Sequence, residues 1–191
     1  MIHLLLGPLL ALCQAPLEVV PTELAPLAKQ VASLAKHAAF STLSAKAWTN
    51  AQKAADAEAL QEALDAQAVL EVRINPEGRV KLARGLGTTS LQSGKPTPLL
   101  VKVVNGSGGQ QRLKPLLQCP GLANSPIQAA WFQGAPGLGQ DLNGHLVEYR
   151  LLLLTASKPG LFEVVFSMEA GQGTQDLGFR GETPLLLRVK P

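Results

Sequence analysis

The feature that most constrains the fold is an alternation of apolar and polar residues over residues 161–190. Seven apolar residues occupy every second position of two runs: Phe162, Val164, Phe166, Met168, Leu185, Leu187 and Val189. A period of two places successive side chains on opposite faces of a strand. We therefore expect two strands that each bury one face, joined by a glycine-rich loop over residues 171–184.

Similar alternation begins at Val69. Asn75-Pro76-Glu77-Gly78 separates two such runs, and its proline and glycine suit the corners of a tight turn. This pattern predicts a β-hairpin. Its outer face, which carries four charged residues, is expected to be solvated: Glu71, Arg73, Arg79 and Lys81.

Further strands are predicted over residues 97–105, 111–118, 127–133 and 145–155, with a long polar loop over 134–144. Pro115 cannot donate a ladder hydrogen bond, so its strand is expected at a sheet edge or a bulge. The strand over 145–155 is apolar on both faces, which indicates that one end is covered, with helices as the candidate cover. About eight short strands with regular turns are typical of an antiparallel, immunoglobulin-like β-sandwich.

The first third of the chain has a different composition. Residues 22–68 are rich in alanine, and five residues recur every three or four positions: Leu24, Leu27, Val31, Leu34 and Ala38. This spacing predicts a helix with one apolar stripe, capped by Thr22. Asp56 is the predicted cap of a second helix through Leu60 and Leu64. The stripe requires a partner, and a helical hairpin, the sandwich and another protein all remain open.

The expected organisation is thus mainly β (α+β overall), with a leader at 1–15, a helical segment at 16–68 and a β-sandwich domain at 69–191. The leader is an apolar run, too short for a stable membrane span, that ends in small residues at Ala15. It predicts export to the periplasm or cell surface. A lipoprotein anchored through Cys13 is less favoured, because Leu12 is larger than that motif usually permits.

Composition excludes several classes of function. Residues 71–191 carry thirteen Lys or Arg against eight Asp or Glu, but these charges are dispersed, so nucleic-acid binding is not expected. Removal of the leader would leave one cysteine, Cys119, expected as a small buried residue rather than a disulfide partner. The sequence contains no zinc, calcium, phosphate-loop or hydrolase motif. We therefore expect neither enzyme activity nor a cofactor.

The polar residues of the loop before the last strand are the candidate recognition site: Gln172, Thr174, Gln175, Asp176, Arg180 and Glu182. The competing interpretation is a structural loop, whose Asp176 and Arg180 bind nearby backbone or each other.

Three segments, LEVRINPEGRVKLARG (70–85), VKVVN (101–105) and GQGTQDLGFRGETP (171–184), resemble the amino-terminal region of large exported bacterial proteins. Those proteins end in a metallohydrolase domain of the PHP (polymerase-and-histidinol-phosphatase) superfamily. The resemblance implies a non-catalytic accessory module, because the metal-binding motifs belong to the later domain and none occurs here.

These observations predict a non-enzymatic exported module that recognises a protein or a surface polymer. Two alternatives remain open. The first is an accessory domain that acts with a separately encoded PHP-type metallohydrolase. The second is a carrier of a small ligand between the helices and the sheet.

Overall fold

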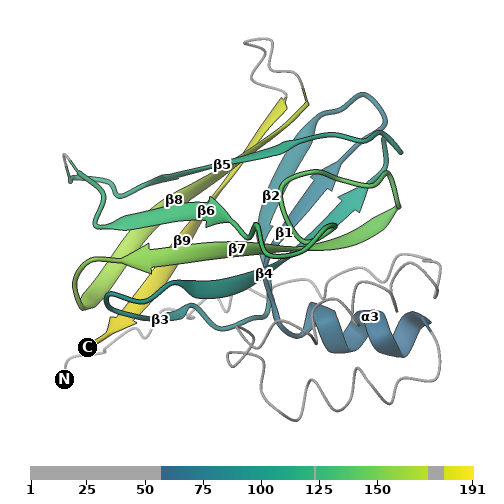
Figure 1. Cartoon of the computed structure of the whole chain (residues 1–191). Coiled ribbons are helices and arrows are strands. Elements are labelled where there is room, and N and C mark those ends of the chain that lie inside the picture. Colours follow the sequence, from purple (N-terminus) through teal and green to yellow (C-terminus); the bar gives the residue numbers. More distant parts are fainter. Residues whose placement is uncertain (1–56, 123, 172–178) are drawn as a thin grey trace, which may run out of the picture.

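The computed structural model describes residues 57–122, 124–171 and 179–191. This part of the chain holds one helix and nine strands (Figure 1). The predicted leader, the apolar stripe from Leu24 to Ala38 and the predicted cap Asp56 lie outside the described residues. The predicted second helix is present as α3, Ala57–Asp65.

The strands form two sheets. One sheet has the strand order β2-β1-β4-β7-β6 and the other has the order β3-β9-β8-β5. The five-stranded sheet comprises β1 (Ala68–Ile74), β2 (Val80–Arg84), β4 (Thr97–Asn105), β6 (Ile127–Trp131) and β7 (Val147–Ala156). The four-stranded sheet comprises β3 (Ser90–Gln92), β5 (Leu113–Gln118), β8 (Gly160–Ala170) and β9 (Arg180–Lys190).

One apolar core lies between the two sheets and takes residues from both. The predicted alternation near the end of the chain is confirmed. Val164, Phe166 and Met168 are fully buried, and Phe162 packs against the core from one end. In the β8–β9 ladder Phe162 pairs with Leu187 and Val164 with Leu185, so the apolar residues of both strands share one face.

The prediction of an antiparallel sandwich is wrong in two places, because β1 pairs with β4 in parallel and β3 pairs with β9 in parallel. The segment 84–96, whose glycines and proline are typical of a loop, contains β3. Gly85 and Gly87 donate hydrogen bonds to the carbonyls of Val69 and Ala68, so the chain stays alongside β1 before it crosses to the other sheet. The fold is therefore a mixed β structure of two sheets.

The edge position predicted from Pro115 is confirmed. Strand β5 is the last strand of its sheet. The N–H of Leu113 points away from β8 and donates to the carbonyl of Gln140, and Pro115 has the same parity. The missing N–H of Pro115 therefore faces the free edge and removes no ladder bond.

Helix α3 covers part of the outer face of the five-stranded sheet. Its buried residues Leu60 and Leu64 belong to a second apolar cluster, which includes Val147, Tyr149 and Leu151 of β7. The prediction that one end of this strand is covered is confirmed. The same cover corrects the expectation for Glu71, which is buried rather than solvated because Lys102 and α3 lie over that row of the sheet.

Candidate functional site

A cleft of about 760 Å³ lies at one end of the four-stranded sheet, where the chain enters β5. Seven residues line it: Gln110, Gln111, Arg112, Lys114, Asp141, Leu142 and Gly171. Six of them come from the glycine-rich loop 106–112, from the polar loop 134–144 or from the start of β5. The last, Gly171, follows the end of β8. The wall is mostly polar, with two amides, two cations and one carboxylate.

Backbone pairing between the two loops builds one wall of this cleft. Arg112 and Asp141 form an antiparallel bridge, in which Leu113 donates to Gln140 and Leu142 donates to Gln111. The Arg112 guanidinium also contacts the Asp141 carboxylate, with Nε 2.8 Å from Oδ1. Both side chains are more than half exposed, so this ion pair contributes at most about 1 kcal/mol to stability.

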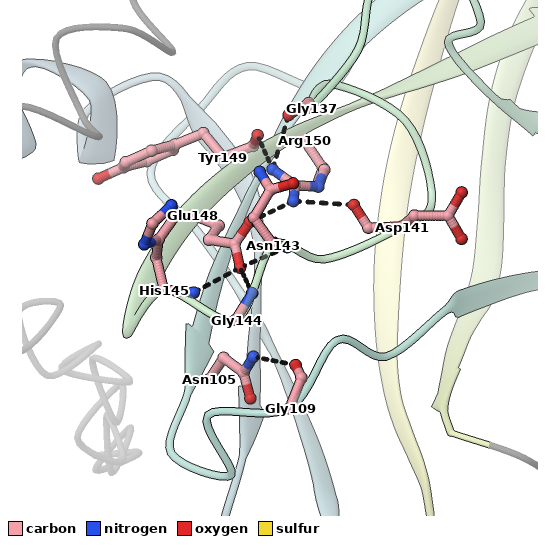
Figure 2. Close-up of polar contacts among 10 residues, drawn as sticks. All are labelled: Asn105, Gly109, Gly137, Asp141, Asn143, Gly144, His145, Glu148, Tyr149 and Arg150. Atoms are coloured by element: carbon pink, nitrogen blue, oxygen red, sulfur yellow. Dashed lines mark hydrogen bonds and ion pairs between the residues drawn. The ribbon is translucent and has the colours of Figure 1, made fainter.

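A fully buried ion pair, Glu148 and Arg150 of β7, contacts the backbone of the long loop at several points (Figure 2). The Glu148 carboxylate accepts hydrogen bonds from the consecutive backbone N–H groups of Asn143, Gly144 and His145, at 2.9 to 3.1 Å. Charge-assisted bonds of this kind are roughly twice as strong as neutral ones. The loop backbone next to Asp141 is therefore fixed by a buried anion.

Arg150 completes this anchor from the same face of β7. Its guanidinium donates to the carbonyl oxygens of Gly137 at 2.7 Å and Asp141 at 2.9 Å, as well as to Glu148. Burial lowers the pKa of Arg150 from its ordinary value, and the adjacent Glu148 carboxylate opposes that shift. The ordinary pKa of an arginine side chain lies far above neutral pH, so Arg150 remains a cation in the folded protein.

The side chain of Gln111, which also lines the cleft, has one amide atom without a partner. Its amide Nε2 donates to the Ser107 hydroxyl at 3.2 Å, and Ser107 in turn donates to Asn105 at 2.7 Å. The other amide atom, Oε1, is buried and meets no hydrogen-bond donor in the part of the chain that the structure describes. A buried acceptor without a donor is costly, so rotation of this amide toward the cleft, where it can accept from a water or a ligand, is favoured.

The sequence-predicted recognition residues divide into two groups. Gln172, Thr174, Gln175 and Asp176 lie outside the described residues. Arg180 and Glu182 were predicted to lie in the loop 171–184, and this is wrong, because both belong to strand β9.

Strand β9 begins at Arg180 because its pairing with β8 extends to the pair Glu169 and Arg180. The β8–β9 ladder is therefore longer than the glycine pattern of the loop indicates. Arg180, Glu182 and Ser167 form a closed triangle, with 2.8 Å between Arg180 and Glu182 and 3.0 Å from Arg180 to the Ser167 hydroxyl. Their contacts to one another favour a structural role.

Residues next to this triangle also serve packing. A Cβ on Gly78 would lie 3.1 Å from the ring of Phe179. A Cβ on Gly181 would lie 2.7 Å from the backbone nitrogen of Leu82. The end of the predicted loop is thus pressed against the β1–β2 hairpin, and the absence of a side chain at Gly181 permits that approach.

A second buried polar cluster lies beneath α3. Lys102 of β4, which is fully buried, contacts Asp65 at 2.6 Å and Glu71 at 3.7 Å. The Tyr149 hydroxyl donates to Asp65 at 2.7 Å. Burial, and then the negative charge of Asp65, raise the pKa of Tyr149 well above its ordinary value. Helix and sheet cover these groups, so they fix the position of α3 and do not face the cleft.

Sequence reasoning found the loops but not the residues of the cleft. Gln110, Gln111, Arg112, Lys114 and Asp141 stand beside Gly108-Gly109 and within the predicted loop 134–144. The signal available was the polar, glycine-rich composition of these two loops, one before β5 and one before β7. The bridge between Arg112 and Asp141, which are 29 residues apart, has no local sequence pattern that would predict it.

In the described residues, no three His, Cys, Asp or Glu side chains are placed to share a metal ion. Cys119 is buried and lies 3.2 Å from the Ser125 hydroxyl, in keeping with the small buried residue that was predicted. The described helix, α3, has neither the length nor the hydropathy of a membrane span.

Comparison with known proteins adds no relative: no family model matches the chain, and a search of curated proteins finds no match. The resemblance to the amino-terminal region of PHP-domain proteins therefore stays a prediction.

Proposed function

We propose that this chain is a non-enzymatic, exported module with an immunoglobulin-like arrangement of its two sheets. It recognises a protein or a surface polymer through the cleft between the loops that precede β5 and β7. The observation that carries this proposal is the buried acceptor Gln111 Oε1, which belongs to a residue of the cleft wall.

The cleft is suited to polar ligands because its wall is organised before a ligand arrives. Glu148 and Arg150 hold the Asp141 side through backbone bonds, and Ser107 holds the Gln111 side. Groups that are already ordered lose less conformational entropy on binding. Amide, guanidinium and carboxylate groups side by side can both donate to and accept from the hydroxyls or amides of a polymer.

The test is binding of the purified chain to cell-envelope polysaccharide and to immobilised envelope proteins. Gln111→Leu removes the acceptor and Arg112→Ala removes a cation of the wall. Lys81→Ala, which removes an exposed cation that does not line the cleft, is the matched control. We expect binding by the wild type and by the control, and at least a tenfold loss for each cleft variant, which corresponds to about 1.4 kcal/mol.

An affinity that is the same for the wild type and for both cleft variants would contradict the proposal that the cleft is the binding site. Metal-dependent hydrolysis of phosphoesters or amides by the purified chain would contradict the non-enzymatic part of the proposal. Specific co-purification with a PHP-type metallohydrolase would favour the accessory-domain alternative instead.

A further inference from the structure

The outer face of the four-stranded sheet carries three of the six exposed large apolar residues of the described chain: Leu116, Leu161 and Leu186. Leu161 is 61% exposed and Leu186 is 49% exposed. Single exposed leucines are ordinary on a protein surface, but neighbouring ones on a flat sheet indicate a contact surface. The register of β8 and β9 shows that Leu161 and Leu186 are such neighbours.

Leu161 stands directly opposite Arg188, and Glu163 stands directly opposite Leu186. These four residues share the outer face, because the alternate residues Phe162, Leu185 and Leu187 pack in the core. The result is a two-by-two arrangement in which the leucines occupy one diagonal and the opposite charges the other. We name this surface, made by Leu161, Glu163, Leu186 and Arg188, the diagonal patch.

We propose that the diagonal patch is the contact surface of a homodimer, in which a second copy of this chain lies face to face on the first. A twofold axis that runs along the leucine diagonal places Leu161 on Leu161 and Leu186 on Leu186 of the two copies. The same axis places Glu163 of each copy next to Arg188 of the other. The patch is therefore complementary to itself, as an isologous interface requires.

The geometry of such a contact is one that sheets adopt. Neighbouring strands lie about 4.8 Å apart and alternate residues of a strand about 6.7 Å apart, so the axis crosses the strands obliquely. The strands of the two copies then cross at roughly 70–110°, in the range of orthogonal sheet packing. A crossing of two narrow sheets buries an area at the low end of specific interfaces, so the dimer is a weak one.

The dimer is tested by sedimentation velocity of the full chain from ~10 μM to ~1 mM. We expect a concentration-dependent shift from monomer to dimer in the wild type. Glu163→Arg and Arg188→Glu each place two like-charged pairs at the interface, and each should weaken association at least tenfold. Leu186→Asp should abolish the shift, whereas Arg84→Glu, an exposed charge change on the other sheet, should leave it unchanged.

Two further measurements depend on the specific pairing between copies. The double variant E163R/R188E restores two opposite-charge pairs and should dimerise like the wild type. An equimolar mixture of E163R and R188E should associate more strongly than either variant alone, because the two different chains complement each other. Wild-type chain that remains monomeric up to ~1 mM, or dimers that survive E163R, would overturn the proposal. Slow amide hydrogen exchange at the diagonal patch in a chain that stays monomeric would also overturn it, because something other than a second copy would then cover the patch.

Discussion

Removal of the Asp65 carboxylate is the sharpest test of how α3 is held on the sheet. Asp65 is the last residue of α3, where its negative charge is unfavourable for the helix dipole. Its position is explained by Lys102, whose ammonium lies 2.6 Å from Asp65 and is fully buried. We therefore predict that Asp65→Ala destabilises the fold although alanine is the better residue for the helix itself.

The size of this loss in stability depends on the contacts that Lys102 and Tyr149 keep after the substitution. Lys102 would retain Glu71 at 3.7 Å, a carboxylate that Arg73 also contacts. Removing one partner of a buried ion pair costs about 3–5 kcal/mol, and the acceptor lost by Tyr149 adds about 1 kcal/mol. Improved helix propensity and relief of the dipole return about 1 kcal/mol. The expected loss in the free energy of unfolding is therefore about 3–5 kcal/mol.

The assay is urea unfolding followed by far-ultraviolet circular dichroism, with the double variant Asp65→Ala/Lys102→Met as the decisive comparison. Replacing both partners removes the buried cation as well, so the double variant should recover at least half of the loss. A loss below about 1 kcal/mol for the single variant would refute the reasoning. So would a double variant as unstable as the sum of the two single ones.

Three further predictions concern single residues. The raised pKa of Tyr149 means that the unfolded chain ionises first, so stability present below pH 10 should fall above it by up to about 1.4 kcal/mol per pH unit. Tyr149 is the chain's one tyrosine, so absorbance at alkaline pH reports it alone, and a Tyr149→Phe control should lose this part of the slope. Phe166→Ala should cost about 3–5 kcal/mol in urea unfolding, because the ring is fully buried, and a much smaller loss would mean that the core closes around the gap. Gly85→Ala should lower the thermal midpoint, because its Cβ would lie 2.1 Å from the Ala68 carbonyl oxygen, and an unchanged midpoint would contradict that close approach.

The strands were predictable where one face is apolar and the other polar. The predicted strand 97–105 coincides with β4, and the alternation of Val164, Phe166 and Met168 was read correctly because packing agrees with local pattern. Pro115 likewise located an edge, since its chemistry allows few alternatives. The short strand β3 was missed, because three residues carry no detectable periodicity.

The buried charges could not be predicted. Glu71, Lys102, Glu148 and Arg150 occupy polar positions of alternating strands, and such positions are normally solvated. Their burial depends on what covers each face, α3 on one side and the loop after β6 on the other. Asp65 and Lys102 are 37 residues apart, so no local window contains that interaction. Glu148 and Arg150 are only two residues apart, but nothing local shows that a loop covers them.

Strand β7 connects these two features of the molecule through three consecutive residues. Tyr149 points to the outer face and binds the last residue of α3, while Glu148 and Arg150 point to the opposite face and bind the loop that walls the cleft. Successive side chains of a strand point to opposite faces of the sheet. The residue that binds the helix, Tyr149, and the two that bind the loop, Glu148 and Arg150, therefore lie on opposite sides of β7. Because Glu148 and Arg150 act through backbone groups, the anchor fixes the path of the loop and leaves the side chains at its tip free to vary. The proposed recognition site could therefore change its ligand by substitution at exposed positions such as Asp141, without disturbing the buried pair that fixes the loop.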